Sequence, residues 1–285
     1  MLVAEKQKNT RSVEREWKAK LSLGFTYKNN KTVLSERKHY GPLVVQRPFY
    51  PEGNDLCHVY LIHPPGGVVG GDKLDLNINL EKQTQVLITT PSAGKFYRSG
   101  VLKGSQTQKL TVAKKSTLEW FPQETIFFNG CNSELETEIK LTSDALFCGW
   151  EINCLGRPAA GEKYQQGKII QKLSLYRDNK PIFLERNEIE GASELLSSAG
   201  GFNDCCVFGT MLATQIDKNL CDELQNYWHE KKEKDVSLTL IKDVLVVRYL
   251  GDSAEQAKKY FSEIWSSVRM KQRNLQACAP RIWST

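Results

Sequence analysis

The chain of 285 residues has no long hydrophobic run. Its apolar stretches are as short as residues 244–247, whereas a membrane-spanning helix needs about 18 or more consecutive apolar residues. Residues 1–15 are polar and charged, and they lack the apolar core of a secretory signal peptide. We therefore expect a cytoplasmic protein without membrane contact. Residues 1–15 are predicted to form a flexible tail and residues 16–285 a single β-rich domain.

The eight cysteines include no Cys-x-x-Cys pair. Such pairs are typical of closed structural zinc sites, so no site of that kind is expected. The chain is also longer than the small secreted domains that disulfides stabilise. We therefore expect free thiols, most of them buried.

The charge balance lacks a strong excess of either sign. The net charge is +6, and lysines alternate with acidic residues, as in residues 230–235. No basic cluster or known nucleic-acid-binding module is present. We expect no nucleic-acid binding, and the small positive excess favours contact with an acidic partner surface.

The sequence also lacks recognisable catalytic motifs. It contains four histidines, but no G-x-S-x-G or H-E-x-x-H segment and no distinctive pair of carboxylates. A catalytic site needs a nucleophile, a base and an oxyanion-binding group that meet in space. We therefore predict that the chain is not an enzyme.

Alternation of apolar and polar residues dominates from residue 17 to about residue 189. Residues 17–25 and 74–80 alternate as half-buried strands do. Further strands are predicted at residues 32–34, 85–90, 107–112, 136–141, 146–153, 168–176 and 182–188. Residues 81–84 are interpreted as a hairpin loop. This spacing predicts a mainly β protein with largely antiparallel pairing.

Helical patterns appear only near the C-terminus. Apolar residues recur with helical spacing in residues 217–232 and 253–273. Ser253 and Gln256 have the spacing of a capping box, which favours a helix that begins there. Between the helices, residues 236–241 and 244–249 are predicted to form a β-hairpin.

A proline- and glycine-rich loop spans residues 63–72. Pro64 and Pro65 fix the backbone angle φ, whereas Gly66, Gly67, Gly70 and Gly71 permit unusual turns. The loop lacks the G-x-x-x-x-G-K-[ST] pattern of phosphate-binding loops. The residues alone favour a structural turn, and an anion site remains the alternative.

Cys57, His58, His63 and Asp72 are candidate metal ligands because thiolate, imidazole and carboxylate all bind divalent metals. Successive side chains of a strand point to opposite faces, so Cys57 and His58 would point apart. Cys57 and His63 would share a face but lie ~20 Å apart along an extended strand. The cysteine and histidines are therefore the weaker candidates for a tight metal site.

Several segments, taken together in this order, resemble one known family. They are residues 51–53 (PEG), 64–72 (PPGGVVGGD), 89–99 (TTPSAGKFYRS), 118–126 (LEWFPQETI), 149–151 (GWE), 155–158 (LGRP), 161–162 (GE), 184–186 (LER), 247–252 (VRYLGD) and 280–283 (PRIW). The family is that of the urease accessory protein UreD, called UreH in some organisms. The resemblance covers the chain except for about the first fifteen residues.

This resemblance implies an irregular superhelix of strands and a non-catalytic scaffold for urease maturation. It implies that the scaffold binds apo-urease with UreF, and with UreG through the assembled complex, and supports nickel delivery. The family is thought to pass nickel through a polar internal channel, so nickel in transit is expected rather than a tightly bound cofactor. Weak, multiple oxygen contacts suit an ion that must leave again. The candidate conduit ligands in the shared segments are Asp72, Glu119, Glu124 and Glu151.

Other residues of the shared segments are candidates for partner binding or for organising loops. They are Pro65, Gly66, Gly67, Gly70, Gly71, Lys95, Tyr97, Arg98, Arg157, Arg281 and Trp283. Two alternative functions remain open at this point. One is a nickel metallochaperone that binds the ion by itself, and the other is an enzyme that uses the glycine loop as an anion site.

Overall fold

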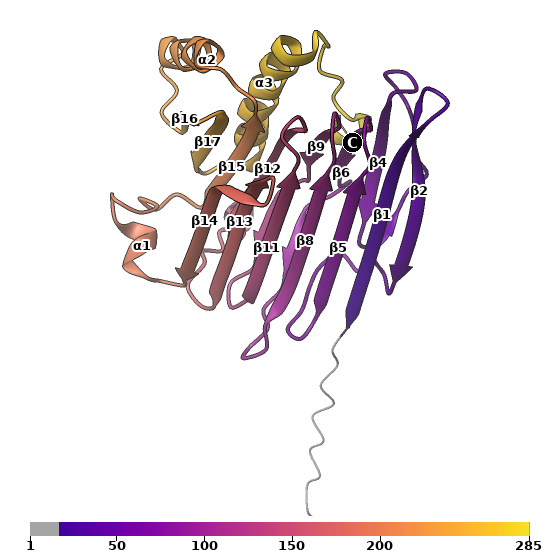
Figure 1. The fold of residues 1–285 in the computed structure, drawn as a ribbon. Coiled ribbons are helices and arrows are strands. Elements are labelled where there is room, and N and C mark those ends of the chain that lie inside the picture. The colour runs from indigo at the N-terminus through magenta and orange to yellow at the C-terminus, as the bar shows by residue number, and fades with distance from the viewer. Residues whose placement is uncertain (1–16, 285) are drawn as a thin grey trace, which may run out of the picture.

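The computed structural model describes residues 17–284, so the tail predicted at residues 1–15 lies outside the described residues. Two β-sheets face each other (Figure 1). The first has seven strands in the order β14-β13-β11-β8-β5-β1-β2. Their bounds are β1 Lys18–Lys28, β2 Lys31–Tyr40, β5 Lys73–Leu80, β8 Gly104–Val112, β11 Asn132–Leu141, β13 Lys168–Arg177 and β14 Lys180–Glu190.

The second sheet has ten strands, eight of which follow the order β16-β17-β15-β12-β9-β6-β4-β3. Their bounds are β3 Val44–Val45, β4 Leu56–Ile62, β6 Gln85–Thr89, β9 Thr117–Phe121, β12 Leu146–Leu155, β15 Val207–Thr214, β16 Val236–Ile241 and β17 Val244–Gly251. The short strands β7 (Gly94–Phe96) and β10 (Thr125–Phe127) continue from β12.

The chain passes from one sheet to the other and back, so that each turn adds one strand to each sheet. After β4 it enters β5 of the opposite sheet, returns as β6, and repeats this through β8, β9, β11 and β12. Neighbours within a sheet therefore run in the same direction. β5, β8, β11 and β13 pair in parallel, and so do β4, β6, β9 and β12.

This winding confirms a mainly β, superhelical architecture but corrects the predicted pairing. Antiparallel pairing occurs only toward the sheet edges, as in β1–β2, β13–β14 and β15–β17. The segment at residues 81–84 is not a hairpin loop, because it joins β5 of one sheet to β6 of the other. Alternation shows which face of a strand is buried but not which strand pairs with it.

The ten-stranded sheet is buried on both faces. Its inner face, with residues such as Leu212, shares one core with Leu23 and Ile139 of the seven-stranded sheet. Its outer face packs against the helices through residues such as Phe121, Met211 and Phe261. All eight residues of β15 are consequently buried, and its sequence shows no alternation. This is why the sequence analysis assigned no strand to Val207–Thr214.

The two predicted C-terminal helices are present as α2 (Lys218–Glu230) and α3 (Ala254–Arg273). Asp217 and Ser253 cap them by accepting hydrogen bonds from the amides of Leu220 and Gln256. The hairpin predicted between them is confirmed as β16 and β17. The structure adds the short helix α1 (Glu194–Ser197) and two 3₁₀ helices at Pro158–Ala160 and Arg281–Ser284. No helix in the described part of the chain is long and apolar enough to cross a membrane.

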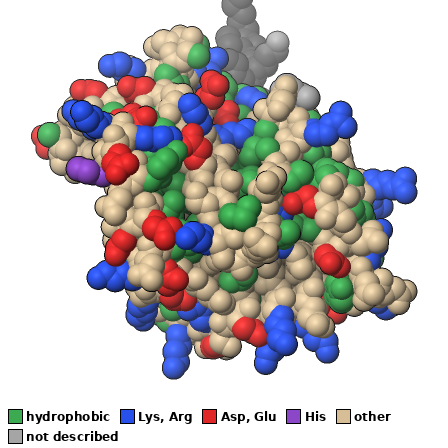
Figure 2. All heavy atoms as spheres, turned by 90° about the horizontal axis from the view of Figure 1, so that it is seen from above, with side chains coloured by type: hydrophobic (Ala, Val, Ile, Leu, Met, Phe, Trp, Pro, Cys, Tyr) green, Lys and Arg blue, Asp and Glu red, His purple; other side chains and the backbone are tan. Residues whose placement is uncertain are grey.

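The surface seen from above carries basic and acidic side chains interspersed, with hydrophobic patches between them (Figure 2). Many surface charges on the strands form ion pairs, such as Lys140 with Glu138 at 2.9 Å. The view shows no area of a single sign. The absence of nucleic-acid binding stays a prediction.

Burial of one sheet on both faces can be tested with adjacent residues. The side chains of Met211 and Leu212 point to opposite faces of β15, and both are at most 1% exposed. The two test variants are Met211→Ala and Leu212→Ala. Each is expected to lower the free energy of unfolding by about 2–5 kcal/mol. On β8 of the other sheet, Leu110→Ala should cost as much, whereas Lys109→Ala should change it by about 0.5 kcal/mol or less. Urea denaturation measures all four, and a tolerated Met211→Ala would contradict the outer packing.

Candidate functional site

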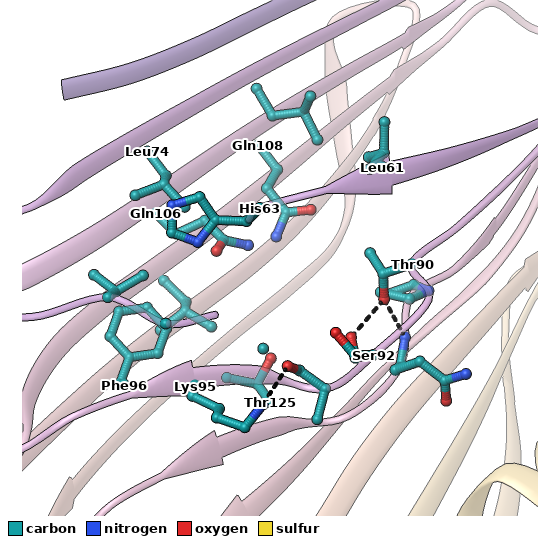
Figure 3. Close-up of a pocket in the computed structure, with 18 of the residues that line it drawn as sticks. Leu61, His63, Leu74, Thr90, Ser92, Lys95, Phe96, Gln106, Gln108 and Thr125 are labelled. Atoms are coloured by element: carbon teal, nitrogen blue, oxygen red, sulfur yellow. Dashed lines mark hydrogen bonds between the residues drawn. The ribbon is translucent and has the colours of Figure 1, made fainter. Parts of the chain in front are cut away.

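A cavity of about 140 Å³, here called the inner cavity, lies between the two sheets. Its polar lining includes His63, Lys95, Gln106, Gln108, Glu151 and Asn153. Figure 3 shows the ring of His63 beside Gln106 and Gln108, with Thr90, Ser92, Lys95 and Thr125 on the opposite wall. Apolar side chains, including Leu61, Leu74 and Phe96, complete the wall. The inner cavity is therefore enclosed largely by apolar groups, with several polar side chains on its wall.

Three buried polar atoms of the cavity wall have no hydrogen-bond partner within residues 17–284. They are Gln108 Oε1, Trp120 Nε1 and Asn153 Nδ2. A buried polar atom without a partner costs about 1–3 kcal/mol. A polar occupant of the cavity, such as water or a hydrated ion, would remove this cost.

Glu151 of β12 also lines the inner cavity. Its Oε1 accepts a hydrogen bond from the hydroxyl of Thr137, and its Oε2 accepts one from Gln171 Nε2 at 2.6 Å. Burial raises the pKa of Glu151 above its ordinary value, the two hydrogen bonds oppose this, and the nearby Glu185 adds to it. No lysine or arginine forms an ion pair with Glu151 within the described residues. A cation beside this carboxylate would therefore be favoured.

A polar path continues from Glu151 to the surface. Glu151, Thr210 and Arg248 occupy directly opposite positions across β12, β15 and β17. A second cavity of about 10 Å³ has Glu151, Thr210 and Thr137 in a lining that otherwise consists of apolar residues and a glycine. Glu185 then accepts hydrogen bonds from Thr210 Oγ1 and from the exposed Arg248, both at 2.9 Å. The path thus leads from the inner cavity to Glu185 of β14 and the exposed Arg248 of β17.

The other candidate metal ligands do not meet at one site. Cys57 and His63 point toward the interior from the two ends of the β4 segment, as the alternation predicted. Burial raises the pKa of the Cys57 thiol to about 11. Asp72 closes the glycine loop, since its Oδ2 accepts a hydrogen bond from the amide of Val69 at 3.0 Å. Within residues 17–284 no three His, Cys, Asp or Glu side chains are arranged to hold a metal ion.

His58 and Glu119 belong to a buried charge cluster on the outer face of the ten-stranded sheet. His58 Nε2 lies 2.8 Å from Glu52 Oε1, and Glu52 Oε2 lies 2.6 Å from Arg269 of α3. Arg269 Nε and Arg273 lie 3.2 and 3.6 Å from Glu119 Oε1. Burial opposes ionisation of Glu52, but its hydrogen bonds with His58 and Arg269 outweigh this and lower its pKa. These groups stabilise one another and face away from the inner cavity.

Glu124 lies in the loop between β9 and β10. The inner cavity is lined by its neighbours Gln123 and Thr125 and not by Glu124 itself. Its charge is close enough to Lys258 of α3 to favour the protonated form of that lysine, although burial lowers the pKa of Lys258 overall. Of the four candidate conduit carboxylates, only Glu151 lines the inner cavity.

The shared motifs meet at one end of the sandwich. The ring of Tyr97 packs on Gly67, where a Cβ would lie 2.3 Å from ring carbon Cε2. The ring centroids of Tyr97 and Phe128 are 4.8 Å apart. Arg157 Cζ lies 4.7 Å from the centroid of the same Phe128 ring. Arg157 pairs with Glu162 at 2.6 Å. The glycine loop is thus a packed turn, and Gly67 is required there because no larger side chain fits.

The remaining motif residues organise neighbouring loops or the C-terminal segment. Arg98 approaches the backbone of Asn129 and Gly130. Gly66 and Gly71 have positive φ angles of 80° and 93°, which favour glycine. Trp283 Nε1 donates to Thr89 Oγ1 at 2.9 Å, and its ring lies among Phe121, Trp150 and Trp265. The C-terminal segment that carries Arg281 and Trp283 therefore packs on its own chain through Trp283.

Sequence analysis did not identify Gln106, Gln108, Asn153 or Gln171. A signal for the first two is present, since Gln106 and Gln108 precede the inward-facing Leu110 and Val112 at intervals of two residues. Polar residues at inward positions of a strand are unusual and point to an internal polar site. The signal is ambiguous from sequence because a strand end often carries polar residues.

Comparison with known proteins gives a consistent result over the whole described chain. The family model "UreD urease accessory protein" matches residues 18–284. The chain is 43% identical to the urease accessory protein UreD of Alcanivorax borkumensis, over 99% of this chain and 98% of that protein. It is 38% identical to UreD of Pseudomonas putida over the full length of both. Against UreD of Azoarcus sp. the identity is 40% over 94% of each chain.

The buried charge cluster predicts a large effect of one substitution. Arg269→Met removes the cation between Glu52 and Glu119, and should lower the free energy of unfolding by about 3–5 kcal/mol. Lys271→Met is the matched control because its ion pair with Glu223 is exposed, and should cost about 1 kcal/mol or less. Urea denaturation distinguishes them, and equal effects would show that the cluster contributes no more than a surface pair.

Proposed function

The chain belongs to the UreD urease accessory protein family and takes part in urease maturation as a non-catalytic protein, and from this premise we propose a specific role for it. It is a scaffold that binds apo-urease together with UreF, and with UreG through the assembled complex. Its interior lets nickel pass toward the urease active site. No cofactor is bound tightly.

The observation that carries this proposal is the polar path through the core. The inner cavity, Glu151, the small second cavity and Glu185 follow one another between the two sheets. Glu151 has oxygen atoms to offer a divalent cation and no basic partner among the described residues. A passing cation would offset the burial that raises its pKa.

The contacts along the path are suited to transit rather than storage. Carboxylate, hydroxyl and amide oxygens of Glu151, Thr137 and Gln108 bind nickel more weakly than a cluster of thiolates and imidazoles does. Nickel can therefore leave the path without breaking a bond to a strong ligand. A metallochaperone that binds nickel by itself would need such a cluster, and residues 17–284 bring none together.

The cytoplasm is the proposed compartment. All eight cysteines lie within the described residues and all are free thiols. Free thiols persist in reducing compartments, whereas secreted proteins commonly carry disulfides.

The test of the scaffold role is urease activation in cells that carry the urease operon without this gene. Supplying the chain should restore both urease activity and the nickel content of purified urease. Coexpression with UreF and affinity purification should recover urease with the chain. Fully nickel-loaded urease in cells lacking the chain would refute the role.

Glu151→Gln should reduce nickel transfer without loss of assembly. The substitution keeps a side chain of similar size but removes the charge that attracts the cation. We expect the nickel content of urease to fall about tenfold or more, because a charged contact worth about 1.4 kcal/mol or more is lost. Glu134→Gln on the solvent face of β11 is the control, since Glu134 pairs with Lys103 and Lys172 instead. A normal nickel content of urease with the Glu151→Gln variant would show that Glu151 is not part of the nickel path.

The same variant predicts a pH effect on stability. The pKa of Glu151 is raised in the folded state, so the protonated side chain contributes to the free energy of unfolding. This contribution is fully present below the ordinary carboxylate pKa and is lost as pH rises through the raised pKa. The free energy of unfolding of Glu151→Gln relative to the parent should therefore rise from about pH 4 to about pH 8. The lower pH is close to the ordinary pKa of a carboxylate, and the higher pH is well above that ordinary pKa. Urea denaturation across this range measures the difference, and a constant difference would contradict the raised pKa.

A further inference from the structure

An open groove of about 430 Å³, here called the edge groove, shares no lining residue with the inner cavity or the second cavity. It runs between β2, the last strand of the seven-stranded sheet (Figure 1), and residues 47–50, which run beside β4 of the other sheet. Its lining comprises Val33, Leu34, Ser35, Arg37, Arg47, Pro48 and Tyr50. The groove is thus an opening between the edges of the two sheets.

Two arginines, one on each side, give the edge groove its charge. Arg37 is directly opposite Leu23 of β1, so its side chain leaves the sheet on the face that carries the core. Neither Arg37 nor Arg47 has an ion-pair partner within residues 17–284, and no carboxylate lines the groove. Lys31 adds a third positive charge, since its Nζ lies 3.9 Å from the ring centroid of Tyr50. Arg37 and Arg47 are both exposed, so carboxylates of a partner could reach their guanidinium groups from solvent.

The edge groove also has an apolar wall and an open backbone edge. Val33, Leu34, Pro48 and Tyr50 are half-buried, and Leu34 and Tyr50 pack against the main core. β2 pairs only with β1, so along residues 33–40 its outer backbone groups have no strand partner among the described residues. An extended chain could bond to this edge while its side chains reach the groove.

We propose that the edge groove binds an extended, acidic segment of a partner protein. The carboxylates of that segment pair with Arg37 and Arg47, whose planar guanidinium groups suit two parallel hydrogen bonds. An apolar residue between the carboxylates contacts Leu34 and Tyr50. A second copy of this chain is a poor occupant, because pairing two β2 edges would bring their arginines together.

This inference is independent of the proposed nickel path, and its test needs neither nickel nor urease. The probe is a fluorescent ten-residue peptide of alternating glutamate and valine, titrated into the full-length chain and followed by anisotropy. Arg37→Glu/Arg47→Glu should weaken binding about tenfold or more, because two charged hydrogen-bond donors are replaced by repelling groups. Lys109→Glu/Lys114→Glu is the control of equal charge change, on and beside the solvent face of β8, and should retain binding within about twofold.

Hydrogen exchange locates the bound peptide. Binding should protect backbone amides within residues 33–38, and the protection should vanish in Arg37→Glu/Arg47→Glu. The proposal is overturned if both double variants weaken binding equally, since only net charge would then matter. It is also overturned if a peptide of glutamate and glycine binds as well as the first, if protection appears elsewhere, or if sedimentation shows a dimer that the arginine substitutions abolish.

Discussion

The helical layer depends on a buried set of charges that balance one another. Glu52, Glu119, Arg269 and Arg273 join a loop, strand β9 and helix α3 on the outer face of the ten-stranded sheet. Removing such groups from water is costly, and their mutual attraction and hydrogen bonds offset this only while the set is complete. Trp265 adds one more hydrogen bond, from its Nε1 to Glu119 Oε1 at 2.9 Å. Because Glu52 and Glu119 are paired in this cluster, their carboxylates are not free to bind a cation.

The two faces of the ten-stranded sheet consequently have different electrostatics. On the outer face, Glu52 and Glu119 form ion pairs with arginines of α3. On the inner face, Glu151 has only hydroxyl and amide partners. The difference arises from strand alternation, because Glu119 and Glu151 lie on opposite faces of neighbouring strands. A single sheet can therefore separate a fixed, neutral framework from a path that still attracts cations.

Sequence patterns predicted most of the longer strands, both C-terminal helices and the family, but not the arrangement of the polar interior. Leu74, Leu76 and Ile78 reveal a buried face because their neighbours are polar. β15 is apolar throughout, so alternation gives no signal there. That Glu119 meets a cation and Glu151 does not depends on the position of α3, which supplies Arg269 from a distant part of the sequence. No local pattern carries that information, so the sequence alone does not distinguish the four candidate conduit carboxylates.

The winding of the chain has a consequence for the order of folding during synthesis. Each turn lies on the one before it, so the two sheets can grow as the chain leaves the ribosome. The contact between Arg269 and Glu52 spans 217 residues and must wait for almost the whole chain. Until then the outer face of the ten-stranded sheet, with Phe121 and Trp150, has no helices to cover it. A nascent chain of this protein is therefore most exposed to aggregation late in its synthesis, when both sheets are built and α3 is not.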